Sequence, residues 1–185
     1  MDKNTNPWKV KTSRNVYESD WIKVEKNDVI KPNGSDGEYS VVHFKNLAIG
    51  IIPLDDDYFT WIVGQFRFPI NTFSWEIPEG GGSLEIPPIE SAKRELLEET
   101  GIVAEDYVEL LKMHLSNSAT DELAILFIAK KLSFQQACPD DTEVLTVKKI
   151  HLNEAFKMCM NGEITDAMSV AGILKAYHLY EKGII

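Results

Sequence analysis

Three glutamates that lie close together in the sequence are the residues best suited to do chemistry. They belong to the stretch Arg94-Glu95-Leu96-Leu97-Glu98-Glu99-Thr100-Gly101-Ile102. A helix would place Glu95, Glu98 and Glu99 at i, i+3 and i+4, on one face within a turn. Like charges packed in this way repel, and a hard divalent cation such as Mg²⁺ or Mn²⁺ would remove the repulsion, because it prefers anionic oxygen ligands. A solvated acidic helix face is the alternative reading of this cluster.

The residues around the cluster predict a helix with a defined start and end. A proline pair at 87–88 can occupy the first turn, where a missing N–H does no harm. Apolar residues recur at helical spacing between Ile89 and Leu96 and form a stripe that can be buried. Gly101 stands where a left-handed C-terminal cap is expected. The upstream run Gly80-Gly81-Gly82 would let a backbone loop approach a metal or phosphate closely.

Together these residues resemble the signature of the Nudix hydrolases, G-x5-E-x7-R-E-U-x-E-E-x-G-U, where U is aliphatic. The second half matches at every specified position, from residue 94 to residue 102. In the first half, counted from Gly80, the first glutamate position holds Ile86, and Glu85 lies one residue early. In the family this glutamate pairs with the arginine and braces the loop against the helix. Glu85 or Glu90 is the alternative partner here.

The likeness extends over most of the chain and indicates one branch of the family. Segments similar to the ADP-ribose and nucleoside-diphosphate-sugar pyrophosphatases are 21–24, 39–44, 52–54, 65–69, 74–78 and 162–167. The resemblance implies metal-dependent hydrolysis of a diphosphate bond, with ADP-ribose cleaved to AMP and ribose 5-phosphate and with Mg²⁺ or Mn²⁺ as cofactor. The chain lacks the proline-containing loop of many ADP-ribose enzymes and has Ser116–Glu122 there instead. Alternatives are another nucleoside diphosphate derivative, such as a dinucleoside polyphosphate or coenzyme A, and a non-catalytic module that binds nucleotide sugars.

The resemblance also implies roles for the residues of the signature. Glu95, Glu98 and Glu99 are the predicted metal ligands, together with a main-chain carbonyl at Gly80 or a neighbour. Glu98 and Arg94 are also predicted as catalytic residues, although Arg94 is expected to brace the loop rather than to touch substrate.

Residues outside the signature complete the predicted site. The candidate general base is Glu143, in a loop after the helix, and a merely solvated loop is the alternative. Asp121 and Glu122 form a second candidate pair, or else lie at a strand edge. Arg67 and Glu76 are predicted to bind substrate, since an arginine can hold a phosphate in bidentate geometry. A surface strand position is the alternative for Arg67.

Composition limits the classes of partner. The chain has 185 residues, 44% of them hydrophobic, which is enough for one ordinary core with a small extra subdomain. Its formal net charge of −10 argues against nucleic acid or an anionic membrane as a general partner. Cys138 and Cys159 have no metal-ligand spacing and are predicted to be reduced, partly buried thiols. No signal peptide or membrane-spanning run is apparent, so a cytoplasmic location is expected.

Strand and helix patterns predict an α+β fold. Short alternating segments before residue 45 indicate an antiparallel sheet around a turn at 31–37. We therefore expect an N-terminal β subdomain at 1–45 and a Nudix domain at 46–185, built as the Nudix α/β/α sandwich with a mixed sheet. By the resemblance the N-terminal sheet would join two copies in a homodimer. The residues that would supply such an interface, or else pack within one chain, are Trp8, Val16, Trp21 and Ile22.

Overall fold

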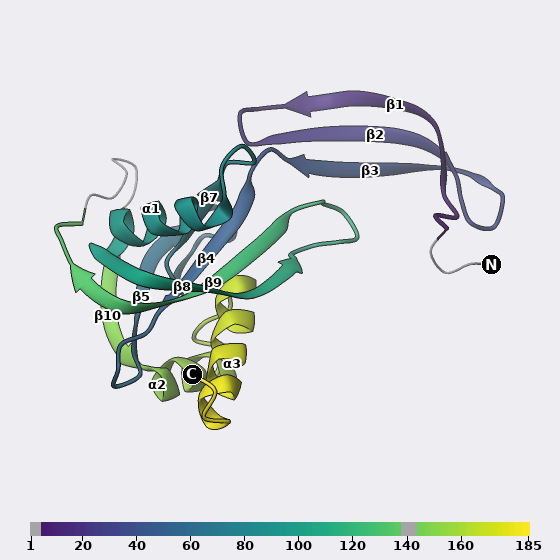
Figure 1. Ribbon diagram of the computed structural model, residues 1–185. Coiled ribbons are helices and arrows are strands. Elements are labelled where there is room, and N and C mark those ends of the chain that lie inside the picture. Colours follow the sequence, from purple (N-terminus) through teal and green to yellow (C-terminus); the bar gives the residue numbers. More distant parts are fainter. Residues whose placement is uncertain (1–4, 138–143) are drawn as a thin grey trace. The chain divides into compact units, whose positions relative to one another are not determined.

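The computed structural model describes residues 5–137 and 144–185. By their internal contacts they divide into two compact units, which are described separately (Figure 1). Unit 1 comprises Met1–Asn46 and His114–Glu122, and unit 2 comprises Leu47–Met113 and Leu123–Ile185. The segment His114–Glu122, which the sequence interpretation assigned to the Nudix domain, therefore packs in unit 1.

Unit 1 is built on a three-stranded antiparallel sheet in the order β1-β2-β3. The strands are β1 (Lys9–Glu18), β2 (Ile22–Ile30) and β3 (Asp36–Phe44). The predicted turn connects β2 to β3, and in it the Gly34 N–H donates to the Lys31 carbonyl at 2.8 Å. Gly34 has a φ of 85°, which glycine adopts without steric penalty. The strands are longer than the short segments expected from the sequence.

Unit 2 contains two sheets that share one core. The first is mixed and runs β7-β4-β9-β8, with β4 parallel to β9; the second is antiparallel and runs β10-β5-β6. Strands of the first sheet are β4 (Leu47–Pro53), β7 (Glu79–Gly82), β8 (Ile102–His114) and β9 (Leu123–Phe134). Those of the second are β5 (Phe59–Arg67), β6 (Thr72–Glu76) and β10 (Thr146–His151), with a 3₁₀ turn η1 (Phe68–Ile70) between β5 and β6.

Helices cover both faces of the mixed sheet in unit 2. Figure 1 shows α1 (Pro88–Thr100) over one face, and α2 (Leu152–Met160) and α3 (Ala167–Glu181) on the opposite side. Strand alternation explains this arrangement, because successive side chains of β4 point to opposite faces. Ile49 and Ile51 pack with Leu96 of α1 in one fully buried cluster. On the other face, a Cβ on Gly172 of α3 would lie 2.7 Å from Leu126 Cδ2, so this helix packs closely on β9.

Two helix ends follow general capping rules, and the one at Gly101 was predicted from the sequence. Gly101 ends α1 in the left-handed conformation, with a φ of 70°, and its N–H donates to the Leu97 carbonyl at 2.9 Å. Asp166 begins α3, where its Oδ2 accepts the Ser169 N–H at 2.8 Å.

Among the described residues, no helix is both long and apolar enough to cross a membrane. Cys159 is a free thiol whose pKa is raised to about 11 by burial.

We expect Gly101→Ala to destabilise the protein by about 3 kcal/mol, as measured by urea unfolding. The new Cβ would require a strained φ and would lie 2.4 Å from the Gln135 carbonyl oxygen. Gly162→Ala is the matched control, because Gly162 also has a positive φ, 75°, but no atom within 4 Å of the added Cβ. Gly162→Ala is expected to lower the free energy of unfolding by about 1 kcal/mol, because it adds backbone strain alone. Equal losses in the two variants would contradict a role for close packing at Gly101.

Candidate active site

The glycine run is a strand, and this strand lies directly on the acidic helix. Gly80 pairs with Ile49 of β4, so the segment is part of the mixed sheet rather than the loop that the sequence predicted. A Cβ at Gly80 would lie 2.3 Å from Glu95 Cδ and 2.4 and 2.5 Å from its two oxygens. At Gly82 the Ile49 side chain occupies the corresponding space, 2.6 Å away. Only glycines allow this close approach of strand and helix.

Two of the three predicted metal ligands are buried where α1 meets β7. Glu95 is 8% exposed and Glu99 is 3% exposed. The Glu79 N–H donates to Glu99 Oε2 at 3.0 Å. Glu98, on the same side of the helix, has a side chain that is 39% exposed. Of the three glutamates that share this side of the helix, Glu95 and Glu99 are therefore buried and Glu98 lies at the surface.

Arg94 joins the helix to the glycine strand. Its Nη2 donates to the Gly81 carbonyl at 2.8 Å and to Glu95 Oε1 at 2.5 Å, and its Nη1 donates to Glu98 Oε2 at 2.6 Å. Burial acts to lower the pKa of Arg94, but the charges of Glu95 and Glu98 outweigh it, so the pKa is raised. Arg94 therefore stays charged, and it contacts the carboxylates of Glu95 and Glu98 and the main chain of the glycine strand.

The position of the first signature glutamate is occupied by an exposed residue. Ile86 is 45% exposed. Glu90, one of the two alternative partners for Arg94, forms an ion pair with Lys93 at 2.8 Å instead. Neither Glu90 nor Glu85 is among the contacts of Arg94 in the described residues. The contact from Arg94 to a main-chain carbonyl thus connects strand and helix without a glutamate at position 86.

Arg67 is engaged by acidic side chains of the same unit. Its Nε and Nη2 donate to the carboxylate of Glu76 at 2.6 to 3.0 Å, and Nη2 also donates to Glu79 Oε1 at 3.0 Å. Glu76 is 2% exposed, whereas the Arg67 side chain is 36% exposed. Burial acts to lower the pKa of Arg67, but hydrogen bonding to Glu76 outweighs it and raises the pKa. The two predicted substrate-binding residues therefore form a bidentate pair with each other.

Glu79 was missed by sequence reasoning. Its side chain is only 8% exposed. Burial raises the pKa of its carboxyl well above the usual range, the neighbouring Asp166 and Glu76 carboxyls act in the same direction, and Arg67 opposes them. Its place between a proline and the glycine run is visible in the sequence. Its burial depends on contacts with β5 and α3 and leaves no local pattern.

Two further sets of residues were predicted as candidates for the general base. Glu143 lies outside the described residues. Asp121 belongs to unit 1, where its Oδ2 lies 2.6 Å from His43 Nδ1 and its Oδ1 accepts the Phe44 N–H at 2.9 Å. Burial acts to raise the pKa of Asp121, but the hydrogen bond to His43 outweighs it and the pKa is lowered. Asp121 thus connects a loop to β3 within its own unit.

The carboxylates at α1 have the chemical character of a divalent-metal site. Glu95 and Glu99 offer hard, anionic oxygens at a buried position beside a strand without side chains, which suits Mg²⁺ or Mn²⁺ better than softer metals. Arg94 is the cation that pairs with Glu95 here. Among residues 5–137 and 144–185, no three His, Cys, Asp or Glu side chains already stand in a ligand geometry. The donor set fits such an ion by residue type and burial.

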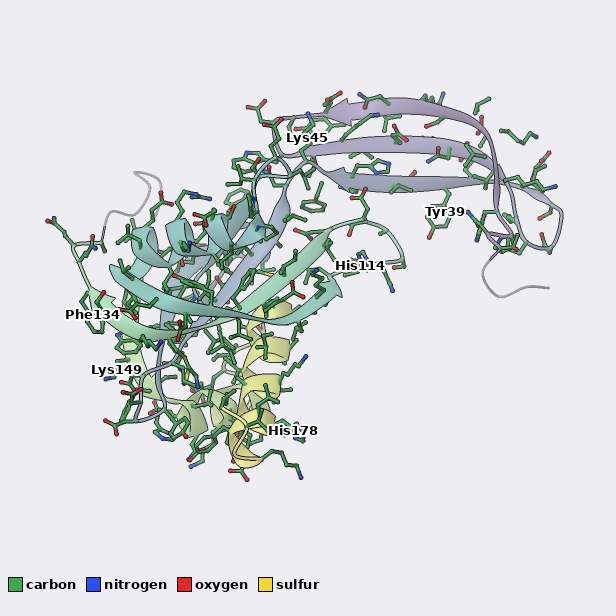
Figure 2. All side chains as sticks on the ribbon, viewed as in Figure 1. Tyr39, Lys45, His114, Phe134, Lys149 and His178 are labelled. Atoms are coloured by element: carbon green, nitrogen blue, oxygen red, sulfur yellow. The ribbon has the colours of Figure 1, made fainter. Side chains whose placement is uncertain are left out.

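A cavity elsewhere in unit 2 contains none of the predicted site residues. Its volume is about 200 Å³. Trp61 and Phe134 line it, with their ring centroids 5.5 Å apart, and so does Lys149, which pairs with Asp55 at 2.8 Å. Figure 2 shows Phe134 and Lys149 on the same side of the unit. Lys149 lies 4.7 Å from the centre of the Trp61 ring, so this lysine already occupies the aromatic surface.

Comparison with known protein families agrees with this geometry. Residues 44–168 match the NUDIX domain. The chain belongs to the Nudix family. Residues 8–42 of this Nudix protein match a second family, the nucleoside diphosphate sugar hydrolase N-terminal domain.

Individual relatives are similar at low identity over most of their length. An ADP-ribose pyrophosphatase of Bacillus subtilis is 28% identical over 160 residues, 85% of this chain and 86% of that protein. A methanol dehydrogenase activator of Bacillus methanolicus is also 28% identical, over 89% of each chain. The crystal structure of an ADP compounds hydrolase superimposes with a TM-score of 0.87 at 20% identity and covers 99% of this chain and 100% of that one.

These findings confirm the predicted fold and family. The α+β architecture with a mixed sheet and an N-terminal antiparallel sheet is shared with the solved ADP compounds hydrolase, and the NUDIX domain match covers most of unit 2. The N-terminal match and the similarity to ADP-ribose pyrophosphatases place this chain in the ADP-ribose and nucleoside-diphosphate-sugar pyrophosphatase branch. It is a Nudix pyrophosphatase, and enzymes of this family generally use a divalent metal.

Proposed function

We propose that this Nudix pyrophosphatase hydrolyses the diphosphate bond of a nucleoside diphosphate sugar, with ADP-ribose converted to AMP and ribose 5-phosphate. The observation that carries the proposal is the pair of buried carboxylates on α1, Glu95 and Glu99, packed against a strand of glycines. The match of residues 8–42 to a nucleoside diphosphate sugar hydrolase domain and the name of the Bacillus subtilis relative support this substrate class.

The residues of the site have separate tasks in this reaction. Water attacks one phosphorus, the bond from that phosphorus to the bridging oxygen breaks, and the other phosphate leaves with its nucleoside or sugar. Glu95, Glu98, Glu99 and a main-chain carbonyl at Gly80 would hold Mg²⁺ or Mn²⁺. A bound cation would neutralise the negative charge that accumulates on the diphosphate oxygens. Arg94 keeps strand and helix together, and Glu143 is the proposed base that takes the proton of the attacking water.

Arg67 and Glu76 are proposed to contact the substrate as a pair. Arg67 uses Nε and Nη2 for its carboxylate partners, which leaves Nη1 without a partner among the described residues. Because the guanidinium is partly exposed and stays charged, this nitrogen is available to a phosphate or base of the nucleotide. Glu76 would then hold the guanidinium in orientation.

The test is a substrate panel with product identification. ADP-ribose, other nucleotide sugars, a dinucleoside polyphosphate and coenzyme A are each incubated with Mg²⁺, with Mn²⁺ and with a chelator, and products are separated by anion-exchange chromatography. We expect AMP and ribose 5-phosphate from ADP-ribose, only with metal. Preferred cleavage of a dinucleoside polyphosphate or coenzyme A would overturn the substrate class. Tight binding of nucleotide sugars without cleavage of any compound would overturn catalysis.

We further propose that the protein is a homodimer in the cytoplasm. All ten residues of the edge strand β1 are exposed, and unit 1 carries exposed Trp8 and Trp21. An exposed edge strand with large apolar side chains is typical of a surface that pairs with another chain. Light scattering coupled to gel filtration would give the mass of two chains, and a monomer would contradict the proposal. Cell fractionation tests the location.

A further inference from the structure

The segment that enters the glycine strand is held by main-chain contacts from several elements. The Ile77 N–H donates to Ser169 Oγ of α3 at 2.9 Å. The Pro78 carbonyl accepts the Ile51 N–H of β4 at 2.8 Å. Ser169 and Ile51 are both fully buried, which keeps water from competing for these bonds. The chain therefore reaches Glu79 with its path already determined.

The Glu79 side chain extends this anchoring to β5. Its Oε1 accepts from Arg67 Nη2 at 3.0 Å. Its Oε2 is buried and has no hydrogen-bond partner among the described residues, and the neighbouring Asp166 and Glu76 carboxyls act to raise the pKa of the group. A carboxyl buried beside two others is costly to desolvate, so stability alone does not account for its presence.

The main chain at Glu79 and Gly80 lies against both buried carboxylates of the site. Its N–H donates to Glu99 Oε2 at 3.0 Å. The next residue, Gly80, lies against the Glu95 carboxyl so closely that a Cβ would overlap it. A displacement of residue 79 would therefore be transmitted to both glutamates. Groups that orient metal ligands in this way typically change metal affinity by about 10–100-fold when they are removed.

We propose that Glu79 is a positioning residue: its side chain, anchored by Arg67, holds the main-chain N–H that orients the Glu99 carboxylate for a divalent cation. The carboxyl of Glu79 touches neither metal nor substrate in this role, and it acts through the backbone. The inference rests on the proposed function only in taking Glu99 as a metal ligand. Glu76 differs from Glu79 in this respect: it also holds Arg67, but it has no main-chain contact with α1 among the described residues.

The experiment measures Mn²⁺ binding without nucleotide, by electron paramagnetic resonance, for wild type, Glu79→Gln and Glu79→Leu. We expect Glu79→Leu to raise the Kd for Mn²⁺ about tenfold. Glu79→Gln should remain within about twofold of wild type, because its amide oxygen can still accept from Arg67. The thermal midpoint should stay level or rise in both variants, since each removes a buried carboxyl. Glu154→Gln, at an exposed ion pair with Lys148, is the control.

The proposal fails if Glu79→Leu binds Mn²⁺ as tightly as wild type. It also fails if Kd rises in both variants in proportion to a fall in thermal midpoint, which a purely structural role would produce. Should Glu79→Leu not fold, Arg67→Met removes the same anchor from the other side and should give the same tenfold weakening. Wild type that binds Mn²⁺ but cleaves no nucleotide sugar would overturn the proposed function and leave this inference standing.

Discussion

Glu99→Gln is expected to lower kcat for nucleotide-sugar hydrolysis by about 10²–10³-fold, the size of effect seen when one electrostatic stabiliser of a transition state is removed. Glu99 is nearly fully buried and is held by the Glu79 N–H. Glutamine has the same shape and can still accept that hydrogen bond, so the substitution removes charge with little change in packing. Initial rates at saturating ADP-ribose and Mg²⁺ measure the effect, and the Mg²⁺ concentration for half-maximal rate should rise in parallel.

Glu90→Gln is the control for that variant. Glu90 lies in the first turn of the same helix, and its ion-pair partner is Lys93, at the surface. An exposed pair contributes at most about 1 kcal/mol, so activity should stay within about threefold of wild type. A similar loss of rate in both variants would mean that the charge of α1 as a whole, rather than a buried ligand, supports the reaction.

Gly80→Ala is expected to reduce kcat/KM by about 100-fold, because a displacement of catalytic groups by about 1 Å has effects of this size. The methyl group would lie 2.3 Å from the carboxyl carbon of Glu95, so this buried carboxylate, which Arg94 holds, would have to leave its position. The affinity for metal should fall together with kcat/KM. A titration with Mn²⁺ measures this affinity independently of turnover.

Gly37→Ala makes a matched comparison in unit 1. There the added methyl would meet only the far end of the flexible Lys31 side chain, at 2.2 Å from Cε, and the lysine can turn away. Activity and stability should be nearly unchanged. If Gly80→Ala were as active as Gly37→Ala, the close contact of the glycine strand with Glu95 would have no part in catalysis.

The helix of the site and its ends could be predicted from the sequence because their causes are local. The apolar spacing from Ile89 to Leu96, the proline pair before them and Gly101 after them act within a few residues. The observed helix spans Pro88–Thr100, as predicted. The cap at Asp166 is local in the same sense, since the side chain bonds to an N–H three residues later.

Long-range contacts decided what could not be predicted. The glycine run became strand β7 because β4 lies beside it and the Ile49 side chain fills the space above Gly82. The arginine of the signature contacts the Gly81 carbonyl, which no spacing rule indicates. The expected substrate arginine, Arg67, pairs with Glu76 and Glu79, nine and twelve residues away in sequence.

The sequence by itself determined the acidic helix, the family and the presence of three glutamates on one side of one turn, because side-chain spacing along a helix is a property of local geometry. Only the tertiary structure decided that Glu95 and Glu99 are buried and Glu98 is exposed. It also decided that Glu79 joins them through its main chain. Burial and orientation depend on which elements pack against a helix, and the neighbours of α1 come from β4, β5, β7 and β9.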